Sequence, residues 1–144
     1  MDTQLAYLAG FVDGEGSIAV GLNKGWKGVR RWYLRFSVHQ LDPRPLRLLA
    51  DLFGGSVRRH GYEARRSRQI FEWVTTSEMA AKAIAALRPY LVVKAEEADV
   101  ALEFQALLNH NAGRRAPLTV EQEAAREDCY LRLRALKQRT YDET

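Results

Sequence analysis

The sequence predicts an α+β fold in which helical and strand-like segments alternate in the order αββαββα. Two observations carry this prediction: apolar residues recur with helical periodicity in some segments, and with the two-residue alternation of strands in the paired segments between them. The 144 residues are 47% hydrophobic, which suits one compact domain with a substantial core. Because no low-complexity linker divides the chain, we expect a single domain over residues 1–144.

The first helix is expected from about Gln4 and is followed by a hairpin. Its apolar stripe consists of Leu5, Leu8, Ala9 and Val12. After Gly16 the pattern changes to strands over residues 17–22 and 30–40, joined by a glycine-containing turn. In the second strand, apolar residues alternate with basic and polar ones. One face of the hairpin is therefore expected to be core, and the other basic and polar.

A second helix and a second strand pair repeat this arrangement. Asp42 and Pro43 are a typical N-cap and first-turn pair, and the glycines at 54–55 end the apolar periodicity of the helix. The strand pattern then returns over residues 56–60 and about 69–75, with an arginine-rich connection between them. The chain therefore predicts two units of helix and hairpin in succession.

Three more helices are predicted in the second half of the chain. Thr76 or Ser77 can cap the first of them. Residues 94–110 and 120–138 have the periodicity of two further helices. Thr119 stands three residues before a glutamine, which is the spacing of a capping box at the start of the last helix.

The charge distribution is typical of a nucleic-acid-binding protein. The net charge is only +4, but residues 23–68 hold twelve of the basic residues and three of the acidic ones, while the rest of the chain is acidic. The sequence has no run of about eighteen apolar residues and no basic leader followed by an apolar segment. We therefore expect an intracellular protein without a membrane span or secretory signal. Its one cysteine, Cys129, cannot form an intramolecular disulfide.

The segment from Leu8 to Gly16 gives the first helix a face with almost no side chains. Gly10 and Gly14 each cost a helix roughly 1 kcal/mol relative to alanine, so the close approach of another helix is expected to offset them. Glu15 stands at the end of the helix, where unpaired carbonyls make a carboxylate unfavourable and a bound cation would stabilise it. The alternative interpretation is a buried amphipathic helix capped by glycine, with Glu15 solvated.

This segment resembles the signature of the LAGLIDADG homing endonucleases. The matching residues are Leu8, Ala9, Gly10, Asp13 and Gly16, and Glu15 replaces the catalytic aspartate. The resemblance implies an αββαββα fold with a saddle-shaped antiparallel sheet over about residues 4–110, and additional C-terminal helices that extend over about 118–139. In this family two signature helices pack together, and each delivers an acidic residue to a central metal site. Because this chain has one signature, the resemblance implies a homodimer with Ala6, Gly10, Asp13 and Gly14 at the interface.

The implied activity is that of an intron-encoded endonuclease. It makes a staggered double-strand break in a long, nearly palindromic DNA site by divalent-metal-dependent hydrolysis of phosphodiester bonds. The implied metal ligands are Gly14, through its carbonyl, and Glu15. We expect Mg²⁺ as the cofactor, Mn²⁺ as a substitute, and Ca²⁺ to support DNA binding without efficient cleavage.

The implied catalytic residues are Glu15, Gln40, Arg44 and Lys94. By resemblance, Gln40 orients water and Lys94 stabilises charge on the phosphate. Ordinary structural roles are the alternative: Gln40 as a strand-end side chain, and Arg44 and Lys94 as surface charges. For Arg44 the two interpretations are close.

Sequence recognition is expected from the polar face of the two hairpins, laid along the major groove. The expected DNA contacts are Asn23, Lys24, Lys27, Arg31, Tyr33, Arg35 and Ser37 from the first hairpin, and Arg58, His60, Arg66, Arg68, Ile70 and Glu72 from the second. Several of the arginines are expected to contact phosphate only. Trp26, at the tip of the first hairpin, is either a DNA contact or part of a local cluster.

Two other classes of function are compatible with this sequence. One is an RNA-splicing maturase or a DNA-binding regulator that keeps the fold without nuclease activity. The other is an unrelated basic αβ protein, such as an RNA binder, with a fortuitous motif. The presence of Glu15, Gln40 and Lys94 together favours the nuclease.

Overall fold

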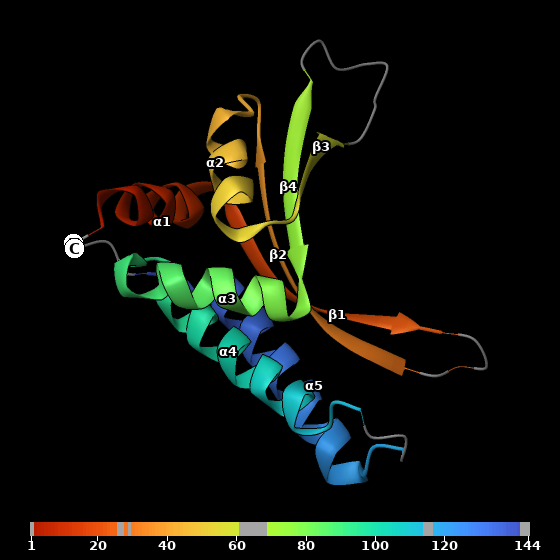
Figure 1. The fold of residues 1–144 in the computed structure, drawn as a ribbon. Helices are drawn as coiled ribbons and strands as arrows, with labels where there is room; N and C mark the ends of the chain where they lie inside the picture. Colours follow the sequence, from red (N-terminus) through yellow and green to blue (C-terminus); the bar gives the residue numbers. More distant parts are fainter. Residues whose placement is uncertain (1, 26–27, 29, 61–68, 114–116, 142–144) are drawn as a thin grey trace.

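The structure is a computed structural model that describes residues 2–25, 28, 30–60, 69–113 and 117–141, except for the side chain of His60. The elements follow the predicted order (Figure 1). The first unit contains α1 (Thr3–Glu15), β1 (Gly16–Lys24), β2 (Arg30–Gln40) and α2 (Arg44–Phe53). The second contains β3 (Ser56–His60), β4 (Ile70–Thr76) and α3 (Ser77–Leu87). A 3-10 turn over Arg88–Tyr90 leads to α4 (Ala95–His110), and α5 (Val120–Lys137) follows.

The strands form one antiparallel sheet in the order β1-β2-β4-β3, so the two hairpins join through β2 and β4. The sheet's core face packs against the helices (Figure 1). Its buried side chains include Ile18, Val20, Leu34, Phe36, Val38 and Trp73. The residues that alternate with them, among them Arg31, Arg35 and Glu72, lie on the opposite side of the strands. We call this side the open face of the sheet.

The helix starts show where local sequence sets the boundaries. The Asp2 carboxylate accepts the N–H groups of Gln4 and Leu5 at 3.0 and 3.1 Å, so α1 begins at Thr3, one residue earlier than predicted. The capping box predicted for α5 is confirmed, with reciprocal hydrogen bonds between Thr119 and Gln122 of 3.1 and 2.9 Å.

The predicted N-cap of α2 is displaced by one residue. Pro43 occupies that position, while the Asp42 carboxylate accepts the Arg44 N–H at 2.9 Å. The two glycines that end α2 have positive φ angles, and Gly55 leaves no room for a side chain. A Cβ there would lie 2.7 Å from the Val74 carbonyl oxygen.

The C-terminal helix α5 packs against α4 and β1 and contributes to the core. Cys129 and Leu133 of α5 are 1% and 2% exposed, and burial raises the pKa of the Cys129 thiol. The indole N–H of Trp32 in β2 donates to the Glu123 carboxylate at 3.0 Å. No helix in the described ranges is long and apolar enough to cross a membrane.

The packing of α5 yields a stability prediction. Leu133→Ala should lower the free energy of unfolding by about 2–5 kcal/mol, because it leaves a cavity against the core. The control Leu131→Ala, at a 52% exposed position of the same helix, should change it by about 0.5 kcal/mol or less. Urea unfolding measures both. Equally small effects would contradict the packing of α5 seen in the structure.

Candidate functional site

The C-terminal end of α1 carries the predicted metal ligands Gly14 and Glu15, and both are exposed. The last turn of α1 has no basic residue of its own, so the Glu15 carboxylate stands at a helix end rich in unpaired carbonyls. Gly10 and Gly14 are open to solvent, and a Cβ at either would meet nothing within 4 Å. Within one chain, the glycine face of α1 is therefore uncovered.

The fold brings Lys94 to this helix end. The Lys94 ammonium donates to the Asp13 carbonyl oxygen at 2.7 Å, although the residues are 81 positions apart. A cation next to the last-turn carbonyls is favoured by the helix dipole. The predicted catalytic lysine and the predicted metal-binding carboxylate thus lie at the same end of α1.

The Asp13 side chain fixes the turn that carries Lys94. One of its carboxylate oxygens accepts the Val92 N–H at 2.9 Å, and the other accepts the Lys94 N–H at 3.0 Å. These two donors immediately precede α4, where a negative charge is favoured. We predicted Asp13 as an interface residue. The structure gives its carboxylate a role within the chain that the sequence did not reveal. The interface assignment of Ala6, Gly10, Asp13 and Gly14 stays a prediction.

Gln40 is the last residue of β2 and Arg44 the first of α2, on either side of the short connection between them. The Gln40 side-chain oxygen accepts the Leu41 N–H at 2.8 Å. The Arg44 guanidinium pairs with Asp42 at 2.6 Å, and its side chain is 83% exposed. Hydrogen bonds from Arg44 lower the pKa of Asp42 to about 2. In this arrangement both side chains bond within their own connection, so their catalytic roles stay predictions.

Sequence reasoning missed one contact beside Lys94. The Arg139 guanidinium, just beyond α5, donates to the Glu97 carboxylate at 2.7 Å and to the Val93 carbonyl at 2.5 Å. Glu97 is only 5% exposed. A cavity of about 340 Å³ adjoins this contact and is lined in part by Gly16 and Lys94. No local pattern could have revealed it, because Arg139 lies 46 positions from Val93.

The donors of one chain fit half of a magnesium site. The Glu15 carboxylate and the Gly14 carbonyl are the hard oxygen ligands that Mg²⁺ prefers. Among the described residues, no group of three or more His, Cys, Asp or Glu side chains is arranged to hold a metal ion. Glu15 and the Gly14 carbonyl therefore account for only part of the coordination that Mg²⁺ takes up.

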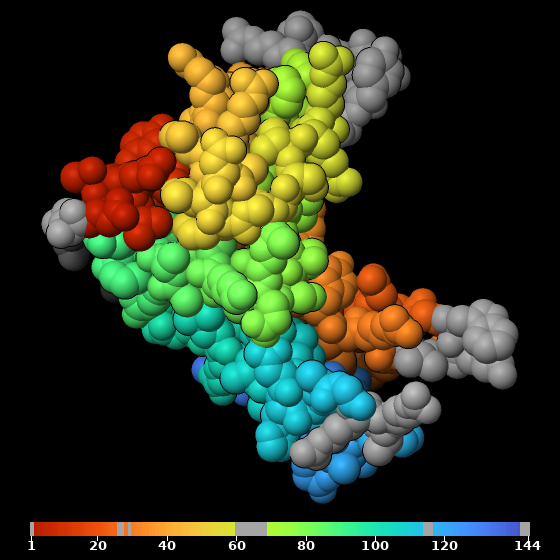
Figure 2. Space-filling model, in the orientation of Figure 1, coloured from red at the N-terminus to blue at the C-terminus, as the bar shows by residue number. Residues whose placement is uncertain are grey.

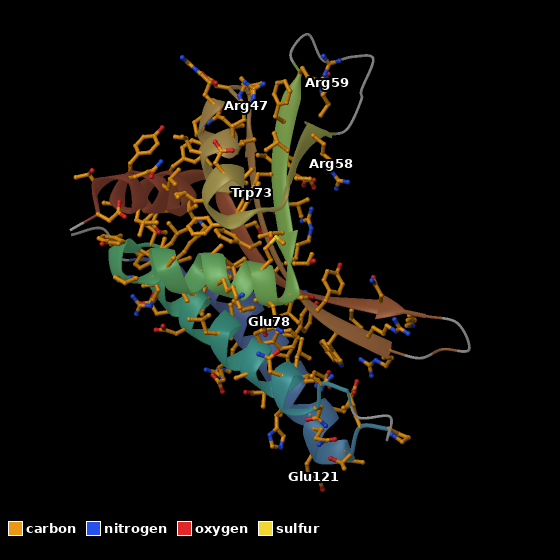
Figure 3. The ribbon with its side chains drawn as sticks, in the orientation of Figure 1. Arg47, Arg58, Arg59, Trp73, Glu78 and Glu121 are labelled. Atoms are coloured by element: carbon orange, nitrogen blue, oxygen red, sulfur yellow. The ribbon has the colours of Figure 1, made fainter. Side chains whose placement is uncertain are left out.

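The open face of the sheet lines a hollow between the β1–β2 hairpin and the arm that contains β3 and β4 (Figure 2). Asn23, Lys24 and Arg31 are exposed on the hairpin arm, and Arg58 projects from β3 (Figure 3). The Tyr33 ring lies across Gly21, where a Cβ would come within 2.2 Å of it. Arg35 and Ile70 are partly exposed. These predicted DNA contacts are accessible to a ligand.

Two of the predicted DNA contacts, Ser37 and Glu72, are buried in the single chain. Ser37 is 1% exposed and Glu72 is 0% exposed, so neither side chain can reach DNA in this conformation. Both lie on the predicted side of the sheet. Arg35, His39 and Arg58 contact Glu72, and Arg35 also donates to the Ser37 hydroxyl at 3.3 Å. The predicted contacts Lys27, Arg66 and Arg68 lie outside the described residues, as do the side chain of His60 and Trp26.

Comparison with solved structures finds three informative likenesses. The homing endonuclease I-CvuI, in complex with the I-CreI target, is 18% identical with a TM-score of 0.74, over 98% of this chain and 86% of that one. The archaeal intron-encoded homing endonuclease I-Vdi141I, complexed with DNA, is 17% identical with a TM-score of 0.75, over 99% and 89%. The LAGLIDADG homing endonuclease I-GzeII, in complex with a DNA target, is 21% identical with a TM-score of 0.66, over 91% and 43%.

These likenesses confirm the predicted fold. The chain has the α+β fold of the LAGLIDADG homing endonucleases, with a four-stranded antiparallel sheet. No protein-family profile and no curated protein matches the sequence.

The contacts of Asp13 yield a second prediction. Asp13→Asn turns an amide NH₂ toward one of the two backbone donors, so the free energy of unfolding should fall by about 1–3 kcal/mol. Hydrogen exchange at the Val92 and Lys94 amides should accelerate. NMR exchange rates measure this effect, with the exposed Asp51→Asn in α2 as the control. Unchanged exchange together with lost association of two chains would assign Asp13 to the interface alone.

Proposed function

We propose that this protein is a homodimeric LAGLIDADG endonuclease that makes a staggered double-strand break in a long, nearly palindromic DNA site. The observation that carries the proposal is the contact of Lys94 with the end of α1 that bears Glu15. A cation, a carboxylate and an exposed glycine face meet at one helix end, and a buried structural helix has no need for this combination. The fold shared with endonucleases solved on DNA supports it.

The proposed chemistry is phosphodiester hydrolysis with little covalent participation by the protein. Mg²⁺ held by Glu15 and the Gly14 carbonyl would supply Lewis acidity and lower the pKa of the attacking water. Lys94, fixed by Asp13, stabilises the charge that develops on the phosphate. Gln40 orients the water, and Arg44 acts near the phosphate after leaving Asp42. Manganese substitution and binding in Ca²⁺ remain predictions.

A second copy of the chain is the proposed partner of the α1 glycine face. Each chain is proposed to supply Glu15 and the Gly14 carbonyl, and a two-fold axis through paired α1 helices would bring the same donors from the partner chain. Double-stranded DNA is proposed to lie on the open face of the sheet, where Arg31 and Arg58 are accessible.

Gly10→Leu tests the homodimer. In the part of the chain that the structure describes, nothing outside the neighbouring backbone of α1 lies within 4 Å of a Cβ at position 10. The substitution should therefore leave the single chain folded while it separates the paired helices. Sedimentation equilibrium should show a dimer for the unsubstituted protein and a monomer for the variant. Ala106→Leu places the same side chain at an exposed position of α4 and should remain dimeric. An unsubstituted protein that is monomeric at micromolar concentration, with undiminished cleavage, would contradict the proposal.

Glu15→Gln tests the catalytic assignment. The substitution nearly preserves shape but removes the charge proposed to hold the metal, so DNA cleavage in Mg²⁺ should fall by orders of magnitude. DNA binding in Ca²⁺ should persist or become tighter, because a negative charge near the phosphates is lost. The exposed Glu121→Gln on α5 serves as the control and should cut normally (Figure 3).

Two outcomes would contradict this assignment in different ways. Normal cutting by the Glu15→Gln protein would leave Glu15 as a solvated helix-end residue. Binding of DNA by the unsubstituted protein without cutting in Mg²⁺ would favour the non-catalytic regulator. Preferential binding of structured RNA would favour the maturase.

A further inference from the structure

Glu72 is a fully buried carboxylate on the open face of the sheet, surrounded by cationic side chains. One of its oxygens accepts from the Arg58 Nε and Nη2 at 3.2 and 3.0 Å. The other accepts from the Arg35 Nη2 at 2.9 Å and lies 2.8 Å from the His39 Nε2. The Glu72 side chain is 0% exposed, whereas those of Arg35, His39 and Arg58 are 32%, 38% and 61% exposed. The partners therefore cover Glu72 and still reach the hollow.

The register of the sheet explains why Glu72 occupies this position. It lies on β4, with His39 of β2 directly opposite on one side and Arg58 of β3 directly opposite on the other. Cross-strand neighbours share a face of the sheet, so their side chains converge above β4. Arg35 lies four positions before His39 on β2 and reaches back along the strand. One carboxylate thus connects three strands.

The ionised form of Glu72 is the stable one in this environment. Burial by itself would raise the pKa of Glu72, but hydrogen bonds from Arg58 and Arg35 outweigh it and lower the pKa below its ordinary value. Among the described residues, two arginines contact this one carboxylate, so their positive charges outnumber its negative charge. The open face therefore still attracts phosphate while its arginines are held in place.

We propose that Glu72 is a specificity-determining positioning residue that makes Arg35 and Arg58 read DNA as one coupled unit. The inference rests on the proposed DNA binding by this face. Immobilising a long side chain on binding costs about two- to twelvefold in affinity, and Glu72 holds both arginines before DNA arrives. The two guanidiniums bind the two oxygens of one carboxylate, so displacement of either changes the charge that the other one faces. The base preferences of the two arginines should therefore be coupled.

Glu72→Gln tests positioning without a large change in shape. Sites are first selected from a randomised DNA library with the unsubstituted protein, and affinity is then measured in Ca²⁺ for a selected site and for unrelated DNA. The variant should bind the selected site at least about fivefold more weakly. It should bind unrelated DNA equally well or more tightly, because a negative charge is gone. Asp51→Asn removes the same charge from exposed α2 and should preserve the ratio of the two affinities.

A purely structural role for Glu72 predicts a different result. Partial unfolding would weaken binding to both DNAs in parallel, and the melting temperature of each variant identifies that case. A parallel loss, or an unchanged ratio of selected to unrelated affinity, would overturn the inference. Weaker binding of the selected site, with unchanged or tighter binding of unrelated DNA, would support it.

A double-mutant cycle tests the coupling directly. Arg35→Ala, Arg58→Ala and the double variant are compared by the same affinity ratio, so that any general loss of binding cancels. In the presence of Glu72, the effect of the double variant should differ from the product of the single effects by more than about threefold. In the Glu72→Gln background, the effects should multiply within about twofold.

The outcomes also separate this inference from the proposed function. If the effects of Arg35→Ala and Arg58→Ala multiply both with Glu72 and in the Glu72→Gln background, the coupling is overturned. The proposal that this face binds DNA would then still stand. Failure of the unsubstituted protein to bind any DNA in the library would overturn the proposed function and the inference together. The cycle requires binding only, so loss of nuclease activity alone would not affect it.

Discussion

The reciprocal contact between Asp13 and Lys94 is the constraint on which the candidate site depends. The Asp13 carboxylate holds the backbone that precedes α4, and the Lys94 ammonium holds the carbonyl of Asp13 at the end of α1. The two helix ends carry opposite partial charges, and each receives the side chain of the sign that stabilises it. These contacts hold the end of α1 against the start of α4. They thereby set the position of Lys94 relative to the helix end that bears Glu15. Arg139, from the far end of the chain, adds a further contact at Val93.

The two faces of the sheet differ in what they bury: the core face buries apolar side chains, and the open face buries a charge. The core face is closed by apolar side chains, with Trp73 and Phe36 in edge-to-face contact at 5.1 Å. The open face contains a buried charge, which is tolerated only because several hydrogen-bond donors surround it. A fully buried carboxylate in a surface proposed to bind a polyanion is costly unless it organises the cations around it. Because β4 pairs with both β2 and β3, Glu72 lies within reach of side chains from both neighbouring strands.

Much of this fold could be predicted because its determinants are local. The αββαββα order follows from the change between helical and strand periodicity, and the capping box of Thr119 fixes the start of α5. The predicted starts of α1 and α2 are each off by one residue. Asp2 caps α1, and Pro43 occupies the N-cap position of α2. The site was only partly predictable. Glu72 and Ser37 were assigned to the correct face, but alternation along a strand does not reveal whether longer neighbours cover a side chain.

The sequence by itself determined the element order, the signature helix with its glycine face, the basic segment and the residues that carry the proposed chemistry. These are properties of short stretches, in which spacing and residue type are enough. Only the tertiary structure decided the partners: Lys94 with the Asp13 carbonyl, Arg139 with Val93 and Glu97, and the cations around Glu72. Each of these pairs joins residues far apart in the chain. Their selection depends on which strands pair, in which register, and which helix ends the packing brings together, and no local pattern contains that information.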